Sequence, residues 1–322
     1  MTGLQLVRRA LAAPAVGPLL ALVVTIAFFS LKSDRFLQAQ NFSLVLQQVM
    51  VVGVLAIGQT LVILTAGIDL SVGTVMAFGQ IVMTKLAVAN GVPAIPAIII
   101  GILTCVGFGM LNGGLVTTVR LPAFIVTLGT LNIAFALTHV VSNDLTFSPL
   151  PSELLFFGRT FTVGGADFTY GVVLMLLLYG LAWFALSQTA WGRHVYAVGD
   201  NREAARLTGI NTERVLFGVY AIAGLAYGIA AMLLAARTEL GDPNAGQTTE
   251  NLDSITAVVL GGTSLFGGRG AVIGTLIGAT IVGVFRNGLT LIGVQVIYQY
   301  LVTGVLVILA VSVDQLTHRR QR

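Results

Sequence analysis

LVLQQVMVVGVLAIGQTLVILTA, residues 44–66, is an apolar run without a single charged side chain. A helix of about 20 apolar residues crosses the hydrocarbon core of a bilayer, so this run predicts a transmembrane helix. The whole chain has the same character, with 56% hydrophobic and 9% charged residues among 322 and a mean hydropathy of +0.93. A soluble domain needs more charge to cover its surface. The sequence therefore indicates a polytopic, all-α membrane protein.

Comparable apolar runs recur along the chain, and we expect ten spans within a single transmembrane domain covering residues 1–322. They cover residues 14–31, 44–66, 70–89, 93–119, 123–142, 169–187, 215–236, 253–267, 270–289 and 294–313. The least regular region is 253–289, where the sequence GGTSLFGGRG is either a turn between two spans or a break inside one.

The positive residues predict the orientation of these spans, because Lys and Arg accumulate on the cytoplasmic side of a membrane. Ten spans place both termini on one side. With both termini in the cytoplasm, the cytoplasmic set is Arg8, Arg9, Arg120, Arg193, Arg202, Arg206, Arg214, Arg269, Arg319, Arg320 and Arg322, which is the majority of the 17 Lys and Arg. The stretches 44–142 and 215–313 then begin on opposite sides with four spans each, which is the topology of a possible inverted repeat.

Between two apolar spans, residues 192–211 read GRHVYAVGDNREAARLTGIN, a charged and helix-capable segment that we call the island. Asp200 or Asn201 can cap a short helix over 201–208, and Gly209 can end it in a left-handed conformation. Ala204 and Ala205 leave one side of this helix small enough to fit a cleft in another protein. The alternative is a solvated loop that carries only topological charge.

TAGIDLSVG, residues 65–73, places a carboxylate at the mouth of a span. An ionisable group at membrane depth needs partners or water, so Asp69 predicts a functional role. Asp69 with Ser71 either caps the following helix or faces a pathway and binds a hydroxyl-rich ligand. Other neutral polar residues suit hydrogen bonding to a sugar, although bonding between helices explains them equally well; the pathway candidates are Asp69, Ser71, Asn112, Thr127, Thr130 and Asn132.

Several classes of function are disfavoured by the sequence. It has no HExxH motif, no P-loop and no paired intramembrane carboxylates, and its three histidines are scattered, so we expect neither an enzyme nor a metal site nor a cofactor. An intramembrane enzyme would need a reactive cluster that is missing here. The net charge of +4 reflects topological bias and the HRRQR tail, so nucleic acid is not an expected partner.

Acidic residues gather in the segments expected outside the membrane. They are Asp34, Asp144, Glu153, Asp167, Glu239, Asp242, Glu250 and Asp253. Charge on such a rim can steer a soluble partner, although a plain solvated surface explains it as well.

Four segments in this order resemble the membrane permease subunits of bacterial ABC importers for monosaccharides, the ribose, xylose and fructose type of the branched-chain-amino-acid/ribose permease superfamily. They are TAGIDLSVG (65–73), LPAFIVTLGTL (121–131), the island (192–211) and LDSITAVVLGGTSLFGGRGAVIGTLIGA (252–279). The resemblance covers essentially the whole chain. The family commonly has Gly-Gly where this chain has Ala66-Gly67.

The resemblance implies a multi-pass subunit of the bacterial inner membrane, surrounded by lipid, that pairs with a second permease copy as a homodimer or heterodimer. It also implies two partners, a cytoplasmic ABC ATPase subunit and an extracytoplasmic sugar-binding protein. The island then corresponds to the family's ATPase-coupling segment, with Gly199, Asp200, Asn201, Ala204, Ala205, Gly209 and Ile210 as contact candidates. The alternative is a related permease for branched-chain amino acids or another small solute.

Overall fold

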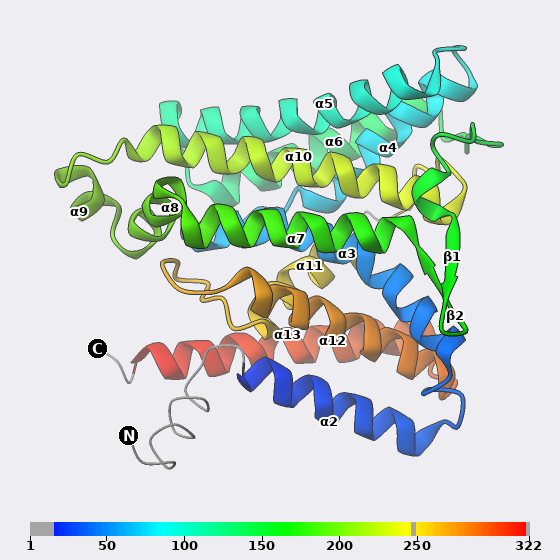
Figure 1. Ribbon diagram of the computed structural model, residues 1–322. Helices are drawn as coiled ribbons and strands as arrows, with labels where there is room; N and C mark the ends of the chain where they lie inside the picture. The colour runs from blue at the N-terminus through cyan, green and yellow to red at the C-terminus, as the bar shows by residue number, and fades with distance from the viewer. Residues whose placement is uncertain (1–15, 246–248, 320–322) are drawn as a thin grey trace.

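The computed structural model describes residues 16–245 and 249–319, which form a bundle of helices with one small hairpin (Figure 1). The helices are α2 (Val16–Lys32), α3 (Ala39–Leu64), α4 (Val72–Val88), α5 (Ala94–Gly114) with the π-helical turn η1 (Leu115–Val119), α6 (Ala123–Ser142), α7 (Tyr170–Gln188), α8 (Ala190–Asp200), α9 (Arg202–Leu207), α10 (Thr212–Thr238), α11 (Thr249–Leu260), α12 (Val272–Leu291) and α13 (Val296–Arg319). The long connection between α6 and α7 contains a 3-10 turn, η2 (Phe156–Gly158), and the antiparallel strands β1 (Thr160–Val163) and β2 (Ala166–Thr169).

Six helices in the described ranges are long and apolar enough to cross a membrane. They are α3, α5 with η1, α6, α7, α10 and α12. Shorter apolar helices are α2, α4 and the first part of α13, Val296–Val305. The prediction of a polytopic helical membrane protein is confirmed, whereas ten crossings remain a prediction.

The predicted span over 253–267 is wrong in its bounds. Helix α11 begins at Thr249, ends at Leu260 and has 12 residues. At 1.5 Å per residue it reaches about 18 Å, which is short of a bilayer core of about 30 Å. The glycine-rich sequence after it forms a loop, residues 261–271, before α12 begins. The GGTSLFGGRG segment is therefore a connection between two helices.

Helices α3 and α10 form the centre of the bundle, because 83% and 78% of their most apolar windows are buried, against 28–33% for α5, α6 and α7. Helix α10 packs closely along α5. A Cβ atom on Gly109 would overlap the carbonyl oxygen of Tyr220, and one on Gly224 would lie 2.5 Å from the carbonyl oxygen of Cys105. Glycine at these two positions therefore permits the close approach of two helix backbones.

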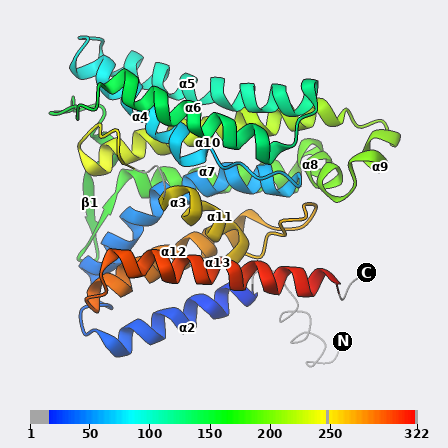
Figure 2. The same ribbon diagram turned by 180° about the vertical axis from the view of Figure 1, so that it is seen from behind.

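The two ends of the bundle differ (Figures 1 and 2). Helices α8 and α9 project at one end, where α2 begins and α13 ends. Strands β1 and β2 lie at the opposite end. The basic residues Arg8, Arg9, Arg320 and Arg322, which contribute to the predicted orientation, lie outside the described residues.

Two helix breaks bring segments from the two halves of the chain together. The chain leaves helical geometry after α3, at Thr65–Ser71, and again after α10, from Glu239 onward. The short helices that follow meet at their N-terminal turns, where the Gly73 amide donates a hydrogen bond to Oδ1 of Asn251. Polar groups from α4 and α11 thus converge inside the bundle.

Candidate functional site

Asp69 lies in the first break and is completely buried. Its Oδ1 accepts hydrogen bonds from the backbone amide of Ser71 at 2.8 Å and from the Ser71 hydroxyl at 2.6 Å. Its Oδ2 accepts one from the Tyr227 hydroxyl on α10 at 3.1 Å. These donors compensate for the loss of water around the carboxylate. The carboxylate bonds to the residue before α4, so it stabilises the turn into that helix and does not bond to the amides of its first turn.

Two more predicted pathway residues contact this segment. The amide of Asn112, on α5, donates to the Ser71 hydroxyl oxygen at 3.2 Å, and the Thr127 hydroxyl, on α6, donates to the Ile68 carbonyl at 3.1 Å. Helices α5, α6 and α10 therefore all hold the Asp69 segment in place. Asp69, Ser71, Asn112 and Thr127 lie in one hydrogen-bonded group, and their place in a pathway stays a prediction.

The other two candidates lie elsewhere. Thr130 is buried and bonds to the carbonyl of Thr127 in its own helix. Asn132 is exposed and bonds to the carbonyl of Leu128 in the preceding turn. Among the described residues, neither the Thr130 hydroxyl nor the Asn132 amide forms a hydrogen bond to the Asp69 segment; bonding within the same helix is the ordinary way to satisfy a polar side chain in a membrane helix.

Sequence reasoning missed the two tyrosines of α10. Tyr220 and Tyr227 are seven residues apart, so they share one face of the helix, and both are almost fully buried. Tyr227 bonds to Asp69, whereas the Tyr220 hydroxyl has no hydrogen-bond partner among the described residues. Their spacing was the available signal, because two phenols on one face of an otherwise apolar helix indicate a buried polar partner.

A cavity of about 390 Å³ lies between the Asp69 segment and the island. Its lining includes Thr65, Ala66 and Gly67 from the first break, the η1–α6 connection, Tyr220, and the residues that join α8 to α9. Asp69 itself does not line this cavity. The segment that carries the carboxylate therefore has open space on its island side.

The island forms two helices. Asn201 caps α9, with its Oδ1 accepting from the Ala204 amide at 2.9 Å, and Gly209 follows with a φ of +88°. The predicted cap and stop are confirmed, with Asp200 as the last residue of α8. Helix α8 was not anticipated; the Thr189 hydroxyl caps it by accepting from the Gly192 amide.

The predicted small face of the island is only partly available. Ala205 is 4% exposed and packs against the bundle, so it cannot fit a cleft in another protein as predicted. Ala204 is exposed, and Leu207 is 77% exposed on the same short helix. Helix α9 has only six residues, too few for a periodic pattern to indicate which side faces inward.

Charged side chains surround α9. Nη2 of Arg206 lies 2.6 Å from Oε1 of Glu203, and this hydrogen-bonded pair lowers the pKa of Glu203. A groove of about 470 Å³ runs beside them. It is lined by Arg120, Arg202, Glu203, Arg206, Thr212 and Glu213. The exposed Leu207 side chain is therefore surrounded by a surface that carries charges of both signs.

A second buried polar cluster surrounds the start of α11 and corrects the predicted acidic rim. Asp253 is 2% exposed and Glu250 is 7% exposed. Nη1 of Arg286, on α12, lies 2.7 Å from Oδ2 of Asp253, and Arg237 interacts electrostatically with Glu250 and Arg286. These two carboxylates are therefore shielded from water. The neighbouring guanidinium groups supply the opposite charge that a buried carboxylate needs.

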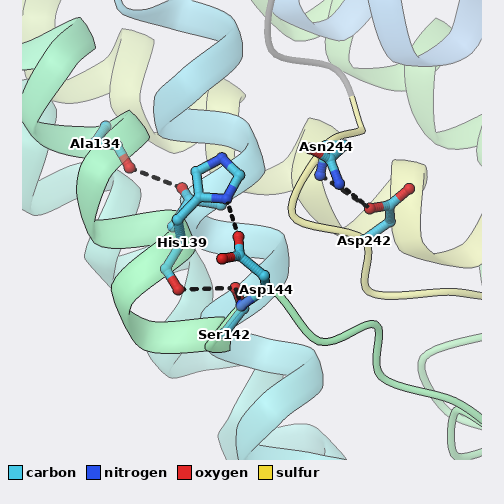
Figure 3. A network of polar contacts seen from close by, with 7 residues as sticks. Ala134, His139, Ser142, Asp144, Asp242 and Asn244 are labelled. Carbon is cyan, nitrogen blue, oxygen red and sulfur yellow. Dashed lines mark hydrogen bonds and ion pairs between the residues drawn. The ribbon is translucent and has the colours of Figure 1, made fainter.

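Other acidic residues of the predicted rim make local contacts at the end opposite α9. Asp144 pairs with Nδ1 of His139, and Asp242 accepts a hydrogen bond from the Asn244 amide at 2.9 Å (Figure 3). The loops that carry them are joined, since the backbones of Phe147 and Gly241 exchange two hydrogen bonds. Within the described ranges, no group of three or more His, Cys, Asp or Glu could hold a metal ion.

Comparison with known proteins places this arrangement in a family. The model for the permease component of branched-chain amino acid transport systems matches residues 41–311. The chain is 47% identical to the fructose import permease protein FrcC of Rhizobium meliloti, over 94% of this chain and 85% of that protein. It is 39% identical to the ribose import permease protein RbsC of Bacillus subtilis, over 93% and 92% of the two chains.

A third relative is the xylose transport system permease protein XylH of Escherichia coli, which is 32% identical over 93% of this chain and 91% of that protein. No solved structure matches the chain. The family match covers both helix breaks, the island and the α11–α12 connection. This chain is therefore a member of the family of membrane permease components represented by the branched-chain amino acid transport systems.

Proposed function

We propose that this chain is the transmembrane permease subunit of an ATP-driven importer, and that it translocates a monosaccharide delivered by an extracytoplasmic binding protein. The observation that carries the proposal is the likeness, over more than nine-tenths of this chain, to permeases named for fructose, ribose and xylose import. The neutral hydrogen-bonding groups around the Asp69 segment agree with a sugar cargo, because hydroxyls exchange hydrogen bonds without burial of further charge. The subunit itself would not be an enzyme.

The alternative cargo is a branched-chain amino acid or another small solute, which the name of the family model favours. Uptake of labelled fructose, ribose, xylose and leucine by cells that contain or lack the chain separates the two. We expect accumulation of one of the sugars that depends on the chain. Accumulation of leucine alone would contradict the sugar proposal.

We further propose ten crossings of the bacterial inner membrane with both termini in the cytoplasm, so that the island is cytoplasmic. The support is that α8, α9, the start of α2 and the end of α13 share one end of the bundle. Glycines in open space on either end allow a direct test, because a cysteine there reacts with an impermeant reagent. In intact spheroplasts we expect Gly164→Cys to be labelled and Gly209→Cys to be protected. The reverse pattern would invert the topology.

The ATPase contact is proposed to lie on the island, at residues 199–210. Because Gly199 and Ala205 are both buried, neither is a contact, and the partner would touch Ala204 and Leu207. We expect Leu207→Glu to abolish capture of the ATPase and to leave the permease folded, since Leu207 is 77% exposed. Ser187→Glu, at an exposed residue near the end of α7, is the matched control. Normal ATPase capture by Leu207→Glu would refute this placement.

At the opposite end, four of the carboxylates left on the rim are proposed to help seat the binding protein. These are the exposed Glu153, Asp167 and Glu239 and the half-buried Asp242. Rim charges act mainly on association rate and are screened by salt. Neutralising all four together should therefore slow binding at low salt and have little effect at high salt. An unchanged association rate at low salt would leave them as ordinary surface.

The helices α3–α6 and α10–α13 are proposed to form an inverted repeat, with the pathway near the two breaks that follow α3 and α10. A second permease copy is proposed to complete the pathway, as a homodimer or heterodimer. The support is the matching order of helices, each set containing a long buried helix, a break, and then a short helix. Such repeats place substrate paths at their interface.

A further inference from the structure

Three segments that are far apart in sequence meet through their backbones at the island end of the bundle. They are 64–67, which run from the end of α3 into the first break, 199–200 at the end of α8, and 267–268 in the α11–α12 loop. The Gly268 amide donates a hydrogen bond to the Leu64 carbonyl at 2.9 Å. This carbonyl belongs to the last turn of α3, so the bond satisfies a group that the helix cannot satisfy itself.

No side chain separates these three segments. A Cβ atom on Gly199 would overlap the Leu64 carbonyl oxygen and would lie 2.7 Å from the Gly268 nitrogen. One on Gly267 would lie 2.7 Å from the Gly199 carbonyl oxygen and 2.8 Å from the Ala66 nitrogen. Rotamer changes therefore cannot absorb a displacement of one segment, and the neighbouring backbone must move with it.

Each segment leads to a different functional part of the molecule. Residues 64–67 continue into Asp69 and α4, residues 199–200 precede α9, and residues 267–268 connect α11 with its buried charge cluster to α12. A further hydrogen bond joins the island to the α11–α12 loop, since the Tyr196 hydroxyl donates to the Gly270 carbonyl at 3.0 Å. A shift of α8 and α9 would therefore reach both helix breaks.

Next to the place where the three segments meet, a cavity leaves room for the first break to move. Thr65, Ala66 and Gly67 line the cavity of about 390 Å³, so the first break is clamped by glycine backbones on one side and open on the other. Ala66 has a φ of +60°, a conformation that a non-glycine residue rarely adopts and that the surrounding contacts must maintain. The segment is thus held by backbone contacts on one side and faces unfilled space on the other.

We propose that Gly199, Gly267 and Gly268 form a joint through which movement of α8 and α9 sets the position of the Asp69 segment. The proposal rests on the proposed transport function, in which an ATPase moves the island. In it, the three glycines are positioning residues. They contact no substrate, and they act by keeping the backbones of the three segments in direct contact.

The chain offers matched glycine controls. Gly268 has a φ of +68° and no room for a Cβ atom, whereas Gly91 has the same φ of +68° with nothing within 4 Å. Gly268→Ala and Gly91→Ala therefore share the backbone strain and differ in the contact. Likewise Gly199→Ala, in a crowded helical position, is matched by Gly180→Ala, in an open helical position.

The test measures ATP hydrolysis and sugar uptake together in proteoliposomes that contain the permease with its ATPase and binding protein. We expect Gly268→Ala and Gly199→Ala to assemble and hydrolyse ATP, and to import about tenfold less sugar per ATP, in the range usual for coupling between sites. Gly91→Ala and Gly180→Ala should behave as the wild type. Equal coupling in the junction variants and their controls would overturn the proposal.

A second measurement does not depend on sugar uptake. Ala66→Cys places a thiol on the cavity wall, and the native Cys105 is buried and gives little background. With the joint intact, ATP binding should change the labelling rate of this cysteine, and Tyr196→Phe, which removes only the bond to Gly270, should reduce that change. Wild-type complex that imports no sugar would contradict the transport function alone. A nucleotide response that Tyr196→Phe and Gly268→Ala leave unaltered would overturn the joint.

Discussion

Buried carboxylates are stabilised in different ways at the two helix breaks. Each break follows a long, mostly buried helix and leads to a short one. One buried carboxylate, Asp69, lies in the first break, and two, Glu250 and Asp253, lie in α11 after the second. At the first break, Asp69 is held by neutral donors from Ser71 and Tyr227. At the second, Asp253 is held by the guanidinium of Arg286, with Glu250 and Arg237 nearby. Hydrogen bonds stabilise one site and charge pairing stabilises the other.

The two sites should therefore differ in how well they tolerate the loss of one partner of the carboxylate. Removal of one partner from a buried ion pair leaves the other charge buried without the opposite charge that offset its loss of water. A carboxylate with several neutral donors loses only one bond when a single donor is removed. The first break can therefore change its contacts stepwise, which suits a moving segment, whereas the second is better suited to fix the position of α11.

The largest expected effect is at the second break. Arg286→Met should lower the free energy of unfolding by about 3–5 kcal/mol, because Asp253 is left buried without its partner. Thermal unfolding in detergent measures this loss. The double variant Arg286→Met/Asp253→Leu should recover most of it, since no unpaired charge remains. A double variant as unstable as the single one would show that the pair is not held by charge.

A loss of comparable size is expected at the first break. Asp69→Leu should leave the donors of Ser71 and Tyr227 unpaired, at about 1–3 kcal/mol for each buried group, and should abolish transport. Asp69→Asn keeps an acceptor oxygen and should retain partial transport and near-normal stability. Tyr227→Phe, which removes one of the three bonds, is the matched control and should resemble Asn. Full transport by the Leu variant would exclude any role for this carboxylate.

The sequence identifies the two breaks unequally for a physical reason. Asp69 stands alone among apolar residues, and its main partner, Ser71, is two residues away, so the local pattern reveals the site. The partner of Asp253 is Arg286, which lies on α12 and is 33 residues away. Carboxylates beside a glycine-rich loop resemble a solvated rim, and only the tertiary packing of a helix too short to span the membrane buries them.

The island shows the same limit on a smaller scale. Its cap, Asn201, and its stop, Gly209, follow from backbone chemistry that depends on adjacent residues alone. The inward direction of Ala205 depends on how α9 packs against the bundle, and a single turn and a half of helix has no pattern that reveals it. Local signals therefore predict where helices begin and end, and packing decides what they bury.

An intermediate effect is expected where the first break meets the island. Asn201→Ala should weaken α9 by about 1 kcal/mol through loss of the cap, whereas Asn201→Asp should preserve it. Hydrogen exchange at the Ala204 amide measures the cap, because that amide is the donor. We expect faster exchange in the Ala variant, with an unchanged melting temperature of the bundle. A lowered melting temperature would mean that α9 supports the membrane helices directly.

The smallest effect tests whether burial, and not distance, sets the strength of these pairs. Arg206 and Glu203 on α9 are 2.6 Å apart and exposed, whereas Arg286 and Asp253 are 2.7 Å apart and largely buried. Solvent screens the exposed pair, so Arg206→Met should leave the melting temperature unchanged. The pair lowers the pKa of Glu203, so its small contribution is present at neutral pH and is lost as the pH falls through that pKa. A drop in melting temperature comparable to that of Arg286→Met would show that burial does not set the strength of these two pairs.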